Sequence, residues 1–301
     1  MTDDRDTGRA TAIVAGTGML WGLYWLPVRA LDARGLSDAW GTAAIALAAC
    51  LLLAPVAAAR WRGLAAAPPA VLVSIALGGA GFALYSVGLV HGRVAIVVLL
   101  FFLTPVWSTL IGRFVLGWPT SPARILAMAV GLAGLGLMLG AEGRLPLPRG
   151  AGEWMGLLAG ILWSVSTTGI RTRSRLGAGE TAFVFAAGAA LAALGLAPLL
   201  AGLPAGPPPG GGAEVAAIAF GTAGLWWVAS VIALMWATLR LEPARVGILL
   251  MVEVLVGAVS AALLAGEHLA PLEIAGGALV VGAGILEVRP PRRRGGPVPK
   301  T

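Results

Sequence analysis

The sequence predicts an all-α polytopic membrane protein with ten transmembrane helices. Of its 301 residues, 58% are hydrophobic and 12% are charged, and the mean hydropathy is +0.89. A soluble domain has about a quarter of its residues charged, so this chain cannot cover itself with a water-compatible surface. The apolar residues also form long runs without alternation, separated by short connections. Such runs favour helices over the strands of a β-barrel.

Ten segments match the roughly 20 apolar residues that a spanning helix needs. In chain order they are Ala10–Leu31, Ala39–Ala59, Pro68–Val90, Val94–Leu116, Ala123–Ala141, Gly152–Ile170, Gly179–Ala201, Ala213–Leu239, Ala244–Ala265 and Pro271–Val288. Acidic residues precede the first run, which is also too long for a cleaved signal, so we expect it to remain as a helix. The single Cys50 excludes an internal disulfide.

The positive residues indicate the orientation of these segments. With the N-terminus in the cytoplasm, sixteen of the 21 Lys and Arg residues fall on the inner side and five on the outer side. Cytoplasmic loops carry such an excess of positive charge, so both termini are predicted to be cytoplasmic. Because this topology explains the net charge of +7, we expect no nucleic-acid partner.

An internal repeat divides the chain into two sets of five segments. The recurring pairs are Leu20-Trp21-Gly22 with Leu162-Trp163-Ser164, Arg29 with Arg171, Leu116-Gly117-Trp118 with Ala265-Gly266-Glu267, and Gly134-x-Gly136 with Gly282-x-Gly284. Because each copy crosses the membrane an odd number of times, the second copy begins on the opposite side and has the inverted topology. In transporters with such inverted repeats, the substrate site lies between the copies. The alternative is chance recurrence in a Gly-rich chain. The predicted units are residues 1–143, residues 144–288 and a basic cytoplasmic tail, 289–301.

These features together resemble the drug/metabolite transporter superfamily. The resemblance rests on the five-plus-five helices, the early Trp of each repeat, Thr104-Pro105-Val106, Ala265-Gly266-Glu267 and the glycine-rich fifth and tenth segments. It is closest to the ten-helix EamA-type exporters, and among them to the bacterial aromatic amino acid exporters. Two positions depart from that pattern, since Trp118 stands where a Glu is common and Val254 where a Pro is expected.

No enzyme motif is present in the sequence. Gly134-x-Gly136 lies inside an apolar run and follows no strand, so it is not a dinucleotide loop. The chain has no Walker A sequence, no H-E-x-x-H and no Cys/His cluster. We therefore expect no enzymatic activity, no cofactor and no metal, and no use of ATP bound to this chain.

Aromatic residues within the runs are the candidate substrate-binding groups. Trp21 and Trp25 share a helix face, Trp163 shares one with Thr167, and Trp226 shares one with Ser230. The full predicted cavity set is Trp21, Tyr24, Trp25, Tyr85, Phe101, Phe102, Trp163, Thr167, Trp226, Trp227 and Ser230. Such a surface stacks rings and orients polar groups with hydroxyls. The alternative role for each ring is helix packing or contact with lipid.

Two further residues are singled out within the runs. Glu253 is the one acidic residue deep in a run, and a charge there is costly and marks an ion or substrate path. Proton coupling and a buried structural carboxyl both remain open for it. Pro105 is the hinge candidate because a proline removes a helix hydrogen bond, and a static bend is the alternative.

The predicted function is export of aromatic and other neutral amino acids, or related amphipathic metabolites, by alternating access. The expected location is the bacterial inner membrane, with a small-molecule substrate and membrane lipids as partners. The sequence is compatible with a monomer. One alternative is a multidrug exporter for lipophilic cations. An alternative of another class is a channel or a membrane scaffold that transports nothing.

Overall fold

The computed structural model describes residues 4–117, 122–141, 147–173, 176–203, 211–238, 240–241, 246 and 249–288, and the regular elements within these ranges are all helices. The described residues up to 141 are called the first half here, and those from 147 the second half. The helices of the first half are α1 (Asp4–Gly22), α2 (Trp25–Asp32), α3 (Ala39–Ala59), α4 (Trp61–Ala66), α5 (Pro69–His91), α6 (Val94–Phe101), α7 (Thr104–Phe114) and α8 (Pro122–Leu139). Those of the second half are α9 (Ala151–Arg173), α10 (Ala178–Leu200), α11 (Gly212–Thr222), the π-helix η1 (Ala223–Ala229), α12 (Ser230–Thr238), α14 (Val252–Leu264) and α15 (Pro271–Val288).

Two predicted runs of the first half are each interrupted by a turn. Leu23 and Tyr24 separate α1 from α2, and Phe102 and Leu103 separate α6 from α7. Pro105 lies in the first turn of α7. The N–H groups of a first turn make no hydrogen bond within the helix, so a proline there costs none. The interruption therefore precedes Pro105, which lies in the first turn of the next helix, and the role of Pro105 as a hinge stays a prediction.

Six helical stretches of the described residues are long and apolar enough to cross a membrane. They are Asp6–Asp32, Ala39–Ala59, Pro69–His91, Val94–Phe114, Ala178–Leu200 and Gly212–Leu234. Three shorter apolar helices, Ile125–Leu139, Val252–Leu264 and Pro271–Leu286, accompany them. Helix α9 is not among the six, since its serines and threonines lower its hydropathy. The broad prediction of an all-helical chain with several apolar helices, compatible with a multi-pass membrane protein, is confirmed.

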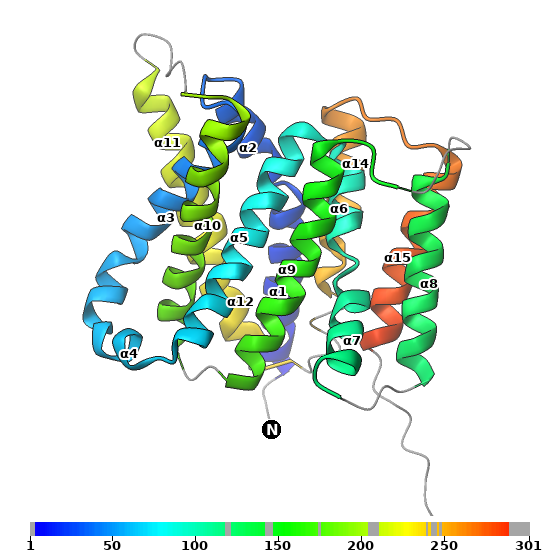
Figure 1. Cartoon of the computed structure of the whole chain (residues 1–301), viewed down its shortest axis with the longest axis horizontal. Coiled ribbons are helices and arrows are strands. Elements are labelled where there is room, and N and C mark those ends of the chain that lie inside the picture. Colours follow the sequence, from blue (N-terminus) through cyan, green and yellow to red (C-terminus); the bar gives the residue numbers. More distant parts are fainter. Residues whose placement is uncertain are drawn as a thin grey trace, which may run out of the picture.

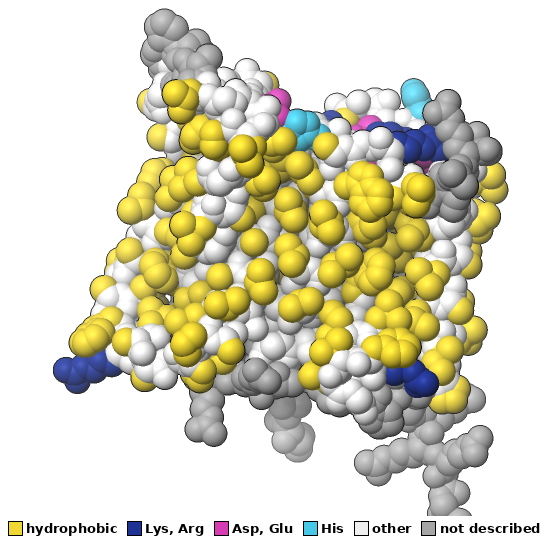
Figure 2. Space-filling model, viewed as in Figure 1, with side chains coloured by type: hydrophobic (Ala, Val, Ile, Leu, Met, Phe, Trp, Pro, Cys, Tyr) yellow, Lys and Arg dark blue, Asp and Glu magenta, His cyan; other side chains and the backbone are white. Residues whose placement is uncertain are grey.

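The helices form a bundle between an upper and a lower edge, and several of them, such as α1 and α9, overlap in this view (Figure 1). We call this bundle the layer. Helix α1 begins at the lower edge and α15 ends there (Figure 1). The face seen in Figure 2 is apolar across its middle, and its charged side chains collect along the upper and lower edges. This distribution suits a layer whose middle contacts hydrocarbon and whose edges contact water.

Helix α5 packs closely against α9 and α10 in the middle of the layer (Figure 1). Small residues permit this approach. A Cβ placed on Gly79 of α5 would overlap the Phe185 carbonyl oxygen and lie 2.7 Å from Ala189 N, both in the backbone of α10. A Cβ on Gly188 of α10 would likewise overlap the backbone of Ala76. The two glycines therefore set the distance between α5 and α10.

Candidate functional site

Ten aromatic rings from both halves contact one another in the middle of the layer. Their contacts have ring centroids 4.7–6.3 Å apart. We call this set the aromatic cluster, and its members are Trp21, Tyr24, Phe82, Tyr85, Phe101, Phe102, Trp163, Phe185, Trp226 and Trp227. Eight of them belong to the cavity set predicted from the sequence, so the structure brings most of that set together.

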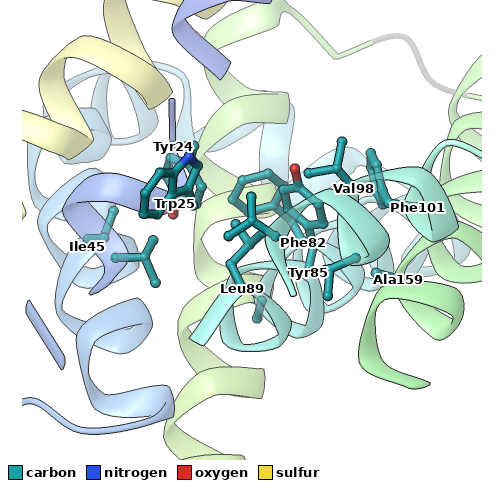
Figure 3. Close-up of a cluster of buried hydrophobic side chains, with 14 of the residues drawn as sticks. Tyr24, Trp25, Ile45, Phe82, Tyr85, Leu89, Val98, Phe101 and Ala159 are labelled. Atoms are coloured by element: carbon teal, nitrogen blue, oxygen red, sulfur yellow. The ribbon is translucent and has the colours of Figure 1, made fainter. Parts of the chain in front are cut away.

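Phe82 of α5 is the centre of the aromatic cluster. Its ring contacts Trp21, Tyr24, Tyr85, Phe185 and Trp227. The contacts with Trp21 and Trp227 are edge-to-face, with interplanar angles of 88° and 89°, which is the favourable geometry for the ring quadrupoles. Figure 3 shows Phe82 and Tyr85 lying between Tyr24 on one side and Phe101 on the other.

The sequence did not single out Phe82 or Phe185. Phe82 lies three residues before Tyr85, so the two share a face of α5, and that spacing was a usable signal. Phe185 lies on α10, whose apolar run contains no Trp or Tyr to draw attention to one face. Only its contacts with Phe82, Trp163 and Trp227 place it in the cluster.

The aromatic cluster has a buried interior and a partly exposed rim. Tyr24, Phe82, Tyr85, Phe101 and Trp227 are each at most 9% exposed. The remaining rings keep intermediate exposure, and they are Trp21, Phe102, Trp163, Phe185 and Trp226. The interior rings fill the space between one another, so a substrate that enters the cluster must separate some of them.

The rim tryptophans are held in place through their N–H groups. Trp21 donates from Nε1 to Ser230 Oγ at 3.2 Å, and Trp226 donates to the Leu20 carbonyl oxygen at 2.8 Å. Ser230 in turn donates to the Trp226 carbonyl oxygen. These bonds cross between α1 and the segment from η1 to α12, so they join the two halves at the edge of the cluster.

Three predicted cavity residues are not among the ten rings: Ser230, which is bonded to the rim tryptophans, and Trp25 and Thr167. Trp25 donates from Nε1 to Ser260 Oγ of α14 at 3.0 Å, and the Arg29 guanidinium lies 5.2 Å from the centre of its ring. Thr167 uses its hydroxyl on its own helix, donating to the Trp163 carbonyl oxygen at 2.9 Å. The predicted common face with Trp163 exists, but the hydroxyl is already bonded to the backbone. Neither Trp25 nor Thr167 joins the contacts among the ten rings.

Glu253 lies in the first turn of α14, next to α1. A Cβ placed on Gly22 of α1 would be 2.7 Å from the Glu253 carbonyl oxygen, so the two helices touch there through their backbones. The Glu253 carboxylate and the Tyr85 hydroxyl are close enough to interact electrostatically. Among the described residues no ion pair holds this carboxylate. Glu253 is thus a carboxylate without an ion pair among the described residues, at the contact of α14 with α1.

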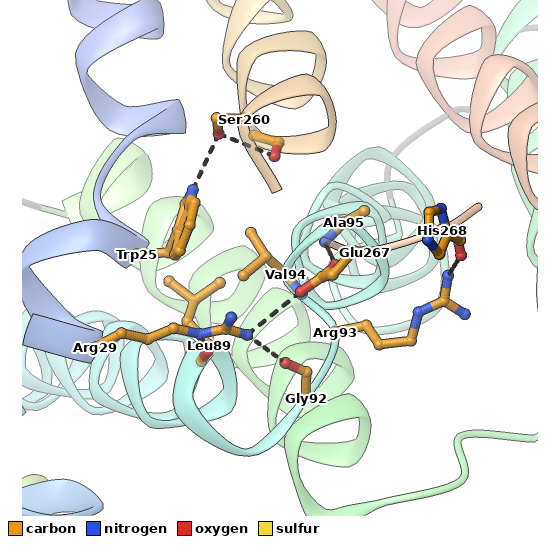
Figure 4. A network of polar contacts seen from close by, with 11 residues as sticks. Trp25, Arg29, Leu89, Gly92, Arg93, Val94, Ala95, Ser260, Glu267 and His268 are labelled. Carbon is orange, nitrogen blue, oxygen red and sulfur yellow. Dashed lines mark hydrogen bonds and ion pairs between the residues drawn. The ribbon is translucent and has the colours of Figure 1, made fainter. Parts of the chain in front are cut away.

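Two neighbouring ion pairs, Arg29 with Glu267 and Arg93 with Glu273, join the halves, and we call them the ionic network. Figure 4 shows Arg29 between Glu267 and Gly92, with Arg93 near His268. Arg29 pairs with Glu267 at 3.3 Å and also donates to the carbonyl oxygens of Leu89 and Gly92. Arg93 binds both carboxylate oxygens of Glu273, at 2.6 and 3.0 Å. This carboxylate raises the pKa of the Arg93 guanidinium, so the pair stays charged at physiological pH.

Glu267 also caps the N-terminus of α6. Its two carboxylate oxygens accept hydrogen bonds from Val94 N at 2.7 Å and Ala95 N at 3.2 Å. The first N–H groups of a helix lack partners within the helix, and a carboxylate there is further stabilised by the helix dipole. Glu267 corresponds to Trp118 in the predicted repeat and belongs to the second half. It therefore stabilises the start of a helix, α6, that belongs to the first half.

A metal site is not formed by the described residues, since no three His, Cys, Asp or Glu side chains among them come together. His91 instead pairs with Asp38, with 2.6 Å between Nε2 and Oδ1.

Comparison with known protein families finds no family that matches the chain. Comparison with curated proteins finds no match either. Fourteen chains of solved structures do match in three dimensions. One of them, a crystal structure of a protein, has 21% sequence identity with this chain and a TM-score of 0.58, over 92% of this chain and 95% of that chain. The similarity shows that the fold is shared along nearly the whole length of both chains.

Proposed function

We propose that the chain is a secondary transporter that exports ring-bearing amphipathic metabolites, with aromatic and other neutral amino acids as the first substrate class. The observation that carries the proposal is the aromatic cluster, to which both halves contribute rings within an apolar helical layer. A substrate held there would lie between the halves, where alternating access requires its site. Flat, rigid rings stack on aromatic substrates, and Trp also accepts a cation over its face.

The proposal includes ten spans in two inverted five-helix repeats, and repeated contacts between the halves support it. A Cβ on Gly18 of α1 would lie 3.4 Å from the Leu249 carbonyl oxygen. A Cβ on Gly160 of α9 would lie 3.4 Å from the Leu100 carbonyl oxygen. Gly160 follows Gly18 by 142 residues and Leu249 follows Leu100 by 149, the spacing of the recurring sequence pairs. The contact of Gly18 with Leu249 and the contact of Gly160 with Leu100 are therefore equivalent, with the roles of the first and second halves exchanged.

A second pair of contacts obeys the same exchange. Gly22 packs against the Glu253 carbonyl oxygen, and Ser164 donates to the Thr104 carbonyl oxygen at 3.1 Å. Ser164 follows Gly22 by 142 residues, and Glu253 follows Thr104 by 149. Glu253 is therefore the second-half counterpart of Thr104, one turn after the Phe101 ring.

Helices α8 and α15 meet through a contact of two glycines that is the same from either side. A Cβ on Gly134 would lie 2.6 Å from the Gly276 carbonyl oxygen, and a Cβ on Gly276 would lie 2.5 Å from the Gly134 carbonyl oxygen. These residues are 142 positions apart, whereas the sequence pairs Gly134 with Gly282, six residues further on. The reciprocal contact is of the kind that a local two-fold axis produces, with an offset that differs from the sequence pairing in these two helices.

The arginines favour an orientation with the lower edge in the cytoplasm of a bacterial cell. At the upper edge Arg29, Arg34 and Arg93 are each paired with a glutamate. Other arginines lie over aromatic rings, as Arg62 does over Trp61 and Arg240 over Trp236. Arg–Trp pairs of this kind suit a membrane–water interface, and the greater number of Lys and Arg favours the cytoplasmic side.

A second candidate function, export of lipophilic cations, is favoured by the position of Glu253. The carboxylate interacts with Tyr85 of the aromatic cluster and has no cation paired with it among the described residues. An unpaired acidic group within an apolar layer marks an ion or substrate path. A cationic substrate would supply the missing partner.

Replacing Trp163 with Ala tests the proposed function. The Trp163 ring contacts Phe101 and Phe185 and is partly exposed, so it is available to a substrate ring. We expect the ratio of Phe flux to Thr flux in liposomes to fall about threefold to tenfold, because only a ring loses a stacking contact worth about 1 kcal/mol. Flux is normalised to folded protein.

The same measurement on Trp21→Ala is the matched experiment, since Trp21 is the first-half counterpart of Trp163. An unchanged Phe-to-Thr ratio in both variants would show that these rings serve packing alone. Saturable flux with counterflow is expected of a carrier. Flux that never saturates would instead indicate a channel, and no flux of any solute would indicate a scaffold.

Replacing Glu253 with Gln tests coupling and the cation candidate together. We expect the variant to fold, to lose the response of transport to a pH gradient and to carry tetraphenylphosphonium more slowly, because a titratable anion has been removed. Glu214→Gln is the control, since Glu214 lies at the edge with a side chain 58% exposed. Persistence of both flux and its pH response in the Glu253 variant would make the carboxyl structural.

A further inference from the structure

Two polar atoms inside the aromatic cluster lack hydrogen-bond partners. They are the Tyr24 hydroxyl and the Trp227 indole nitrogen. Tyr24 is 0% exposed and Trp227 is 4% exposed, so bulk water does not reach either group. Buried donors are almost always bonded in folded proteins, and an exception calls for a ligand or a bound water. Burying either donor without a hydrogen bond costs free energy of folding. A Phe side chain in either place would pack without this cost, so packing alone does not explain these residues.

The two orphaned groups lie next to each other and next to a hydroxyl pair. The Tyr24 hydroxyl lies beside Ser86 and beside the Trp227 nitrogen, but neither contact has the geometry of a hydrogen bond. Ser86 Oγ is 2.7 Å from Thr42 Oγ1, and both residues are fully buried. The four side chains come from the turn after α1, from α3, from α5 and from η1. They form a polar spot between otherwise apolar rings.

We propose that Tyr24 and Trp227 form a subsite that binds an uncharged oxygen acceptor, such as an amide carbonyl, of a ring-bearing substrate. This inference rests on the proposed transport of ring-bearing amphipathic metabolites, and within that class it favours molecules with an uncharged acceptor, such as amides, over free amino acids. The indole N–H can only donate, and the tyrosine O–H can donate as well. One carbonyl oxygen has two lone pairs, so it can accept from both groups at once. The rings around the subsite, with Phe82 in contact with both residues, would hold the apolar part of the same molecule.

The charges around the subsite favour an uncharged acceptor over a carboxylate. None of the ten rings of the aromatic cluster has a Lys or Arg over its face among the described cation–ring contacts. Among the described residues, the Glu253 carboxylate interacts electrostatically with Tyr85 of the cluster. A substrate carboxylate would lose its water without gaining a cation and would be repelled by Glu253. An ammonium group on the same substrate would be attracted toward Glu253.

The experiment compares three probes of one ring system with purified wild-type protein in detergent. Phenylalaninamide carries an uncharged carbonyl, phenethylamine lacks it, and phenylalanine carries a carboxylate in its place. Calorimetric titration is expected to show phenylalaninamide binding about threefold to tenfold more tightly than phenethylamine, the effect of a hydrogen bond between uncharged groups. Tyr24→Phe removes one of the two donors and is expected to reduce this preference, and the double variant with Trp227→Phe is expected to bind the two amines equally. Trp227→Phe removes the second donor and should act in the same direction.

Trp107→Phe is the matched control. The Trp107 indole nitrogen is also buried without a partner, but its ring is not part of the aromatic cluster. It should therefore leave the ratio between the two amines unchanged. A preference for phenylalaninamide that survives Tyr24→Phe and Trp227→Phe overturns the subsite. Tightest binding of phenylalanine, lost in Tyr24→Phe, overturns the uncharged acceptor. Failure of folded wild-type protein to bind any of the three probes overturns the proposed function as well, whereas equal binding of both amines by wild type overturns only the subsite.

Discussion

Replacing Gly79 with Ala is expected to destabilise the protein by more than about 3 kcal/mol, above the usual cost of overpacking a core. The added methyl group would overlap the Phe185 carbonyl oxygen and come within 2.7 Å of Ala189 N. Both atoms belong to the backbone of α10, so no side chain can rotate to make room. Helices α5 and α10 would have to separate, which would disturb Phe82 and Phe185 together. Thermal unfolding in detergent, followed by circular dichroism, measures the effect.

Gly195→Ala is the matched control for this substitution. Gly195 lies on α10, the helix that Gly79 contacts, and a Cβ there would meet nothing within 4 Å. Alanine is also the better helix former, so the change should alter stability by no more than about 1 kcal/mol. Equal midpoints of thermal unfolding for Gly79→Ala and Gly195→Ala would show that Gly79 does not set the distance between α5 and α10.

Replacing Glu267 with Ala is expected to cost about 3 kcal/mol of stability, the usual effect of removing one partner from a buried ion pair. The Glu267 side chain is 10% exposed and that of Arg29 is 29% exposed, so water compensates little of the loss. The substitution also removes the acceptor of the first two N–H groups of α6. The midpoint of thermal unfolding should fall, and the upper ends of α2 and α6 should lose their link to the loop before α15.

The exposed pair of Arg34 with Glu214 provides the control. Its N–O distance is 2.8 Å, shorter than that of Arg29 with Glu267, but its side chains are 36% and 58% exposed. Glu214→Ala should therefore leave the midpoint of thermal unfolding close to that of the wild type. If both substitutions had the same small effect, the ionic network would contribute nothing to holding the halves together.

Much of the helical architecture could be predicted because long apolar runs leave few alternatives. The predicted run Ala39–Ala59 coincides with α3, and the predicted run Pro68–Val90 differs from α5 by one residue at each end. The breaks were harder to predict. Leu23 and Tyr24 interrupt the first run directly after Gly22 and three residues before Pro27, but neither residue type marks the position of the turn exactly. Phe102 and Leu103 interrupt the fourth run just before Thr104 and Pro105.

The candidate site was predictable where helical spacing places residues on one face. Trp21 and Tyr24 are three residues apart, and their rings are in contact. Pairings across the two halves were not predictable from one sequence. Arg29 and Glu267 are 238 positions apart, and nothing local in either residue indicates the other. Trp25 shares a face with Trp21 by spacing, but the turn after α1 redirects it toward Ser260.

The π-helix η1 has a consequence for how relatives of this chain would have to be aligned. A π-helical turn is equivalent to one residue inserted into an α-helix, and η1 contains both Trp226 and Trp227. Deletion of a single residue there would restore a regular α-helix and rotate everything before it by about 100° relative to α12. Either the Trp227 ring would then lose its contact with Phe82, or Ser230 would lose its hydrogen bond with Trp21. A one-residue gap in this segment between two homologues would therefore mark a rebuilt binding surface, even where every aromatic residue is retained.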